Sequence, residues 1–173
     1  MADYILGSGD LYLLVADTIP EDVQLETDEN KIAHISGGAT LTYTNETYEV
    51  VDDFNAILGR IITKEDVTFK TGVLTWGLEV LNRLVASSAY TAGSDGQPDT
   101  LKIGGQSGSG MKKVVVRFVH TMPDGKKLKM TMIGNNDAGM ELSFAKDKET
   151  IVDAEIKALS QEDGTLVEIT MEK

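Results

Sequence analysis

Residues 127–133 read KLKMTMI, a stretch in which Leu, Met and Met alternate with Lys, Lys and Thr. The same alternation of apolar and polar residues returns three times further along the chain, in residues 140–144 (MELSF), 152–158 (VDAEIKA) and 167–171 (VEITM). A period of two places successive side chains on opposite faces of a strand. Four such segments in succession predict an antiparallel sheet with one buried apolar face and one solvated charged face. We therefore expect a mainly β protein.

Earlier parts of the chain extend this sheet. Residues 113–121 (KVVVRFVHT) are apolar on both faces, which predicts a central strand, and the PDG turn at residues 123–125 joins it to residues 127–133 as a hairpin. Further strands are predicted at residues 10–16, 32–44, 65–71 and 100–103, with a bulge or bend at the glycines 37 and 38. The acidic residues 17–31 are expected to form a surface loop.

One helix and one flexible loop complete the expected domain. In residues 78–86 the apolar side chains of Leu78, Leu81 and Val85 form one helical stripe, with Thr75 or Gly77 as the candidate N-cap. Residues 104–111 are rich in glycine and serine and predict a flexible loop. At 173 residues the chain is expected to form a single domain, residues 1–173.

Residues 45–64 are the ambiguous part of the chain. Tyr48, Val50 and Val51 indicate an extended arm. Phe54, Ile57, Leu58 and Ile61 then follow the spacing of one face of a short helix, for which Asp52 or Asp53 is a possible N-cap. The segment holds more large apolar side chains than a solvated loop needs, so we expect it to pack on something, either its own domain or another chain. These side chains are Tyr48, Phe54, Ile57, Leu58, Ile61 and Ile62.

Composition narrows the classes of function. The net charge is −12 at a pI near 4.5, whereas a protein that binds nucleic acid by neutralising phosphates is usually basic. The chain has no cysteine, which excludes disulfides, thiolate metal sites and cysteine nucleophiles. Residues 1–7 lack the features of a signal peptide, and no stretch is apolar for the roughly 20 residues of a membrane span. We expect folding in a reducing cytoplasm, without a membrane.

No catalytic, metal or cofactor constellation is predicted. Residues 104–110 (GGQSGSG) lack the lysine that must follow the last glycine of a phosphate-binding loop, and a strand follows instead of a helix. The only histidines, His34 and His120, are far apart and fall on predicted strands, where structural roles are the simpler interpretation. The paired carboxylates lack the spacing of a calcium loop. The chain is therefore expected to be neither an enzyme nor a cofactor-binding protein.

Five stretches, in the same order as in the family, resemble the major tail tube proteins of tailed bacteriophages, in the form common in phages and prophages of Gram-positive bacteria. They span nearly the whole chain: residues 6–13 (LGSGDLYL), 35–41 (ISGGATL), 71–81 (TGVLTWGLEVL), 117–124 (RFVHTMPD) and 144–154 (FAKDKETIVDA). Gly77 differs from the better capping residue expected at the start of the family's helix. No single stretch is diagnostic, and the resemblance rests on all five together.

The resemblance implies a β-sandwich or half-barrel with one flanking helix. Six copies would form a ring whose sheets close into a continuous β-barrel, and stacked rings would form a tube that conducts DNA from the capsid into the host. The partners would be other copies of the chain, initiator or baseplate and terminator proteins, and a sheath in a contractile tail. DNA would pass as non-specific cargo. The location would be the virion tail, after synthesis and assembly in the host cytoplasm.

The resemblance also assigns roles to two groups of residues. The segment at residues 45–64 becomes an arm that contacts a neighbouring subunit. The charged face of the predicted sheet becomes the candidate lumen wall, with four acids against three bases: Lys127, Lys129, Glu141, Asp153, Glu155, Lys157 and Glu168. A closed barrel removes exposed strand edges, and an acidic conduit does not retain DNA through ion pairs.

Two alternatives stay open. The inner tube of a contractile injection system or a phage-tail-like bacteriocin shares the same fold. A monomeric β-sandwich binding module, for example for carbohydrate, belongs to a different class. Such modules usually expose several aromatic side chains on one sheet face, and the predicted wet faces lack an aromatic stripe.

Overall fold

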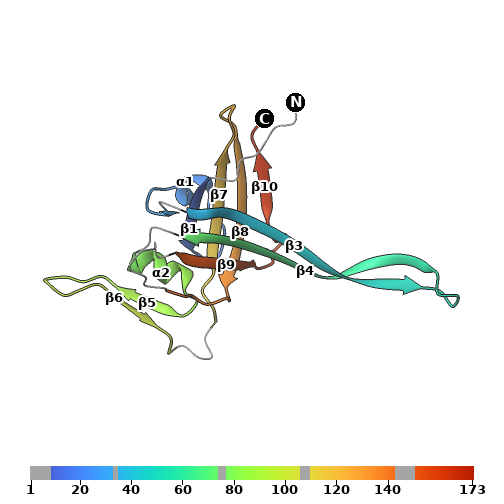
Figure 1. Ribbon diagram of the computed structural model, residues 1–173, viewed down its shortest axis with the longest axis horizontal. Coiled ribbons are helices and arrows are strands. Elements are labelled where there is room, and N and C mark those ends of the chain that lie inside the picture. Colours follow the sequence, from blue (N-terminus) through green and yellow to red (C-terminus); the bar gives the residue numbers. More distant parts are fainter. Residues whose placement is uncertain (1–8, 33–34, 74–76, 106–109, 143–150) are drawn as a thin grey trace.

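The computed structural model describes residues 9–32, 35–73, 77–105, 110–142 and 151–173 (Figure 1). Ten strands and two short helices occur in this part of the chain, so the protein is mainly β, as predicted. The elements are, in chain order, β1 (Asp10–Val15), α1 (Asp22–Leu25), β2 (Lys31–Ile32), β3 (Ile35–Val51), β4 (Ile57–Val73), α2 (Leu78–Leu84), β5 (Ser88–Thr91), β6 (Thr100–Ile103), β7 (Val114–Thr121), β8 (Lys127–Asn136), β9 (Val152–Ala158) and β10 (Glu168–Met171).

Eight of the strands form one antiparallel sheet. Its path is β2-β1-β7-β8-β9-β4-β3, and β10 pairs with β8 beside this path. β7 pairs with β1 on one side and with β8 on the other, and most of its side chains on both faces are buried. This confirms the prediction of a central strand. The turn that joins β7 to β8 closes through a hydrogen bond from the Met122 amide to the Lys126 carbonyl.

The sheet folds back on itself where β8 passes to β9. These two strands share only a short register, from Gly134 opposite Ala158 to Asn136 opposite Ile156. Beyond it, β3, β4 and β9 run across β7 and β8 at a steep angle (Figure 1). The apolar faces of the two halves therefore meet in one core, in which the ring centroids of Phe69 on β4 and Phe118 on β7 lie 6.2 Å apart.

Helix α2 contributes Leu81 and Leu84 to this core. Its N-cap is Gly77, which offers no side-chain hydrogen bond, and it ends two residues earlier than predicted because Val85 adopts an extended backbone. The separate two-stranded ribbon β5–β6 leaves the body on the side opposite to the ends of β3 and β4 (Figure 1).

Several sequence predictions are confirmed residue by residue. The predicted strand at residues 152–158 coincides with β9, and residues 127–133 lie in β8, which continues to Asn136. The predicted bulge at the two glycines is present as a shift of the β3–β4 register between Ser36 and Ala39, with Gly38 at a φ of 76°.

Three of the predictions about the sheet and the acidic segment are wrong within the described residues. Met140 to Leu142 are not in a strand, and the remainder of the predicted strand at 140–144 lies outside the described residues. The acidic segment 17–31 is not only a solvated loop, because it contains α1 and buries Leu25 and Asn30. Ile169 and Met171 alternate as predicted but are more than half exposed, since no described element covers their end of the sheet.

The loop predicted at residues 104–111 lies partly outside the described residues. Gly104 and Gly105 at its start have positive φ angles of 88° and 78°, a conformation that favours glycine. Of the two histidines, His34 lies outside the described residues, and His120 is buried on β7.

Candidate functional site: the projecting hairpin and the charged sheet face

The outer halves of β3 and β4 form a two-stranded hairpin that extends away from the body (Figure 1). Within the described residues, β9 pairs with β4 only from Thr68 to Val73, and β3 pairs with no strand other than β4. Residues 45–64, which we call the projecting hairpin, therefore lie beyond the last strand that could flank them. For this ambiguous segment the sequence indicated an extended arm followed by a short helix from Phe54.

The helix interpretation is wrong, and the turn at residues 52–56 gives the reason. One carboxylate oxygen of Asp52 accepts hydrogen bonds from the amides of Phe54 and Ala56, both at 2.9 Å. The Asp52 amide bonds the Ala56 carbonyl, and Asn55 adopts a positive φ of 61°. An Asp or Asn that bonds its own following backbone competes with the helix, so Asp52 closes a turn here instead of capping a helix.

The projecting hairpin exposes an unusual number of large apolar side chains. Its twenty residues contain seven of the fifteen such side chains that are exposed in the described part of the chain. Phe54 at the tip is 91% exposed and Leu58 is 68% exposed. The set comprises Tyr48, Val51, Phe54, Ile57, Leu58, Ile61 and Ile62. It includes all six residues predicted for the arm, and none of the six is buried by the described part of its own domain.

Ion pairs across the two strands hold the projecting hairpin in register. The guanidinium of Arg60 lies 2.9 Å from the Glu49 carboxylate opposite it. At the base, the Lys64 amine lies 3.8 Å from Glu46 on the opposite strand and 2.7 Å from Asp66 on its own strand, and the hydrogen bond to the Asp66 carboxylate is the main cause that raises its pKa. Opposite charges facing each other across strands favour this pairing over a slipped one.

Most of the residues predicted for the lumen wall share one face of the sheet. Lys157 on β9 lies opposite Asn135 on β8, and Asn135 has the same parity as Lys127 and Lys129. Glu168 lies opposite Thr131 and falls on the same face. The register thus brings six of the seven predicted residues together: Lys127, Lys129, Asp153, Glu155, Lys157 and Glu168. Glu141 is not among them, because it lies outside the strands.

This charged face is divided into a covered part and an open part. Helix α1 lies over the β7–β8 part, where Leu25 packs with Val115 and Ile133. The side chain of Lys129 is only 17% exposed there, so it does not stand on an open wet face as predicted. The β3–β4–β9 part is polar and open, with Thr40, Thr42 and Asp153 exposed and Lys70 paired to Glu155 at 2.8 Å.

A cluster of four charges fastens α1 to the sheet. Arg117, which is buried on β7, lies 2.6 Å from Asp22 and 2.7 Å from Glu26. The amine of Lys129 lies 2.9 Å and 2.8 Å from the same two carboxylates. The hydrogen bond from Arg117, followed by that from Lys129, lowers the pKa of Asp22 to about 2. Glu26, and then Asp22, raises the pKa of Lys129.

Sequence reasoning missed this cluster, although a signal was present. A single arginine interrupts the apolar run VVVRFV at residues 114–119, and a buried guanidinium requires a carboxylate partner. The two acids that pair with it, Asp22 and Glu26, are 95 and 91 positions away in the sequence, and only the fold brings them together.

Lys112 and Ser88 lie close enough to suggest a nucleophile and its base, with 2.8 Å between Nζ and Oγ. The amine also donates to the carbonyl and the side-chain oxygen of Asn82, at 2.8 Å and 2.7 Å, and burial lowers its pKa. With all three N–H groups directed at oxygens, the amine has no lone pair to act as a base. The group stabilises the C-terminal end of α2, where carbonyls lack helical partners.

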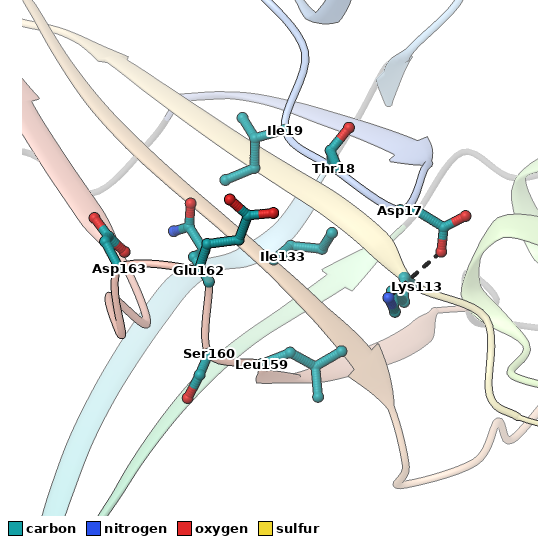
Figure 2. Close-up of a pocket in the computed structure, with 10 residues that line it drawn as sticks. Asp17, Thr18, Ile19, Lys113, Ile133, Leu159, Ser160, Glu162 and Asp163 are labelled. Atoms are coloured by element: carbon teal, nitrogen blue, oxygen red, sulfur yellow. Dashed lines mark ion pairs between the residues drawn. The ribbon is translucent and has the colours of Figure 1, made fainter.

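A cleft of about 710 Å³ opens between the loop after β1 and the loop after β9 (Figure 2). Ile19, Ile133 and Leu159 supply apolar surface, and Glu162 and Asp163 lie along one side. On the other side the Lys113 amine is 3.5 Å from Asp17. The described residues hold no group of three or more side chains suited to a metal, and none of their helices is long and apolar enough to cross a membrane.

No protein-family model matches the chain, and no curated protein matches it.

Proposed function

We propose that this chain is the structural subunit of a bacteriophage tail tube, which polymerises as stacked hexameric rings into a conduit for DNA. The observation that carries the proposal is the projecting hairpin, which presents its apolar side chains to solvent beyond the reach of the chain's own core. Monomeric proteins rarely expose apolar patches of more than a few hundred Å², and larger patches mark interaction sites.

Two further features support the proposal that this chain is one subunit in the wall of a larger tube. In the part of the chain that the structure describes, the eight-stranded sheet is open, because β2 and β3 at the ends of its path do not pair with each other. Open edges are usually protected or paired, and pairing with neighbouring subunits in a ring would satisfy them. The open β3–β4–β9 part of the charged face carries threonines and internally paired lysines, which suits a wall that polyanionic DNA passes without being held.

Electron microscopy and size-exclusion chromatography of the concentrated protein test this proposal. The unsubstituted chain is expected to form hollow six-fold rings or tubes. Phe54→Asp is expected to leave the fold intact and to abolish these assemblies, because a carboxylate cannot be buried unpaired in an apolar contact. Val23→Asp is a matched control, since Val23 on α1 is 85% exposed and lies outside the projecting hairpin.

The outcomes separate the candidate functions. If Phe54→Asp still forms tubes, the projecting hairpin is not part of the contact between subunits. A chain that remains monomeric at every concentration would contradict self-assembly and favour the monomeric binding module, which carbohydrate binding would then test.

A further inference from the structure

The chain contains three Asp-Gly pairs, and each lies at an exposed turn: Asp95-Gly96, Asp124-Gly125 and Asp163-Gly164. In such a pair the side-chain carboxyl carbon of the aspartate can reach the amide nitrogen of the glycine, which no side chain shields. Because the two residues are the same in all three pairs, the hydrogen bonds of each turn decide how readily the pair reacts.

An Asp-Gly pair can form isoaspartate with water as the only other reactant. The glycine amide loses its proton to solvent and its nitrogen attacks Cγ of the neutral carboxyl group. The new N–Cγ bond closes a five-membered ring, and the Cγ hydroxyl group leaves as water. Water then opens the ring. Cleavage of the N–Cγ bond restores aspartate, whereas cleavage between the nitrogen and the backbone carbonyl carbon gives isoaspartate. One water is released and one is consumed, and nothing is oxidised or reduced.

At the turn between β7 and β8 both reacting groups are engaged. The Gly125 amide donates a hydrogen bond of 2.9 Å to the Met122 carbonyl. The Asp124 carboxylate accepts a hydrogen bond of 3.1 Å from the Lys126 amide. The nitrogen and the carboxyl group must therefore both leave their partners before the ring can close.

The turn after β9 is held in the same way. The Gly164 amide donates to the Gln161 carbonyl at 3.0 Å, and the Asp163 carboxylate accepts from the Thr165 amide at 2.9 Å. The bond from the Thr165 amide is the main cause that lowers the pKa of Asp163, so the neutral carboxyl group that reacts is scarcer there.

In the loop between β5 and β6 both reacting groups are free. Among the described residues, none bonds the Asp95 carboxylate, and the Gly96 amide donates no hydrogen bond. The turn bond here runs from the Gln97 amide to the Ser94 carbonyl at 2.9 Å, so it does not use the reacting nitrogen. A Cβ at Gly96 would meet no atom within 4 Å. Asp95 also has a positive φ of 50°, an uncommon backbone conformation for a residue other than glycine.

The base of this loop is closed, which confines the change to its tip. The Asp99 carboxylate accepts hydrogen bonds from the Gly93 amide at 2.8 Å and from the Tyr90 hydroxyl at 3.1 Å. A Cβ at Gly93 would clash with the Gln97 carbonyl, so the chain is closely packed there. Asp95 lies beyond these contacts, on the ribbon that leaves the body (Figure 1). Isoaspartate would lengthen the main chain by one atom at this tip.

We infer that Asp95 is a modification site, at which the folded chain converts to isoaspartate while Asp124 and Asp163 are protected by their turns. The reaction does not depend on the proposed assembly. Isoaspartate carries a free α-carboxylate, and at this exposed tip it is a substrate for carboxyl methyltransferases that use S-adenosylmethionine to methylate that group.

Ageing of the folded full-length chain at neutral pH and physiological temperature tests the inference. Cleavage after lysine and arginine places the three pairs on separate peptides, residues 84–102, 118–126 and 158–173. Isoaspartate in each peptide is measured by methyl transfer from labelled S-adenosylmethionine and by uptake of heavy oxygen from labelled water. We expect it to form about tenfold faster in residues 84–102, because two hydrogen bonds must break first at each of the other turns.

Two controls separate the turn from the sequence. In guanidinium, where the turns are lost, the three pairs of the full-length chain should react at similar rates. Asp95→Glu keeps the charge but would need a six-membered ring, so the isoaspartate signal should disappear from residues 84–102. That loss would assign the signal to Asp95 and not to Asp99 on the same peptide.

Equal rates at the three pairs of the folded chain would overturn the inference, and so would faster reaction at Asp124 or Asp163. A preference for Asp95 that persists unchanged in guanidinium would also overturn it, since neighbouring sequence would then be the cause. Failure of the chain to form tubes contradicts the proposed function alone, so the two proposals fail independently.

Discussion

The inner and outer halves of β3 and β4 are parts of the same two strands, yet the apolar side chains of the inner half are buried and those of the outer half are exposed to solvent. In the inner half β9 lies beside β4, the body covers one face, and Val67, Phe69 and Val73 are buried. In the outer half no third strand follows among the described residues, and Ile57, Ile61 and Ile62 are half exposed. Apolar side chains in a strand therefore indicate a surface that is buried in some contact. Whether that contact is made by the same chain depends on which elements lie beside the strand.

The largest expected effect is on the free energy of unfolding, and it comes from truncating one phenylalanine in each half. Phe69→Ala should lower the free energy of unfolding by about 3–5 kcal/mol, because it leaves a cavity against Phe118. Phe54→Ala at the exposed tip should change it by less than about 0.5 kcal/mol. Urea denaturation of the monomeric chain measures both. Similar losses for the two variants would mean that the tip packs on its own domain.

Two glycines, one in the body and one in the projecting hairpin, should also differ in how much a substitution lowers stability, by a smaller amount. A Cβ added at Gly134 on β8 would lie 2.1 Å from the Lys157 carbonyl on β9, where the two halves of the sheet join. Gly134→Ala should therefore cost about 1–3 kcal/mol, as overpacking usually does. Gly59→Ala on the projecting hairpin meets no atom within 4 Å and should be nearly neutral. Equal stability of the two variants, measured by thermal unfolding, would show that β8 and β9 separate easily.

The smallest effect concerns pH. The pKa of Asp22 is about 2 in the folded chain, below its ordinary value of 3.8. A lowered carboxyl pKa contributes stability that is complete above pH 3.8 and is lost as the pH falls through about 2. Because Asp22 is about half exposed, we discount the contribution for solvent screening to about 1 kcal/mol.

Asp22→Asn should thus lower the stability at neutral pH and flatten its decline between about pH 4 and pH 2. Asp53→Asn is the control, since Asp53 is exposed on the projecting hairpin and forms no ion pair within the described residues. Chemical denaturation at a series of pH values gives both curves. An unchanged slope for Asp22→Asn would contradict the role of the α1 charge cluster.

Local chemistry made a large part of the fold predictable. Alternation over residues 152–158 depends only on near neighbours in the sequence, and β9 has the predicted bounds. The glycines at 37 and 38 predicted a bulge because few other residues tolerate its backbone, and the turn at residues 123–125 followed from its own residues. In the projecting hairpin, by contrast, the spacing of Phe54, Ile57 and Ile61 fits a helix as well as it fits a turn followed by a strand.

The amino-acid sequence by itself determined most of the strands of the sheet, that the chain is acidic, and that residues 45–64 carry apolar side chains in need of a partner. Only the tertiary structure decided that these side chains extend beyond the core, that α1 covers Lys129, and that Arg117 meets Asp22. Secondary structure follows from backbone and side-chain preferences over a few residues. Burial and charge pairing depend instead on which distant segments the fold brings together.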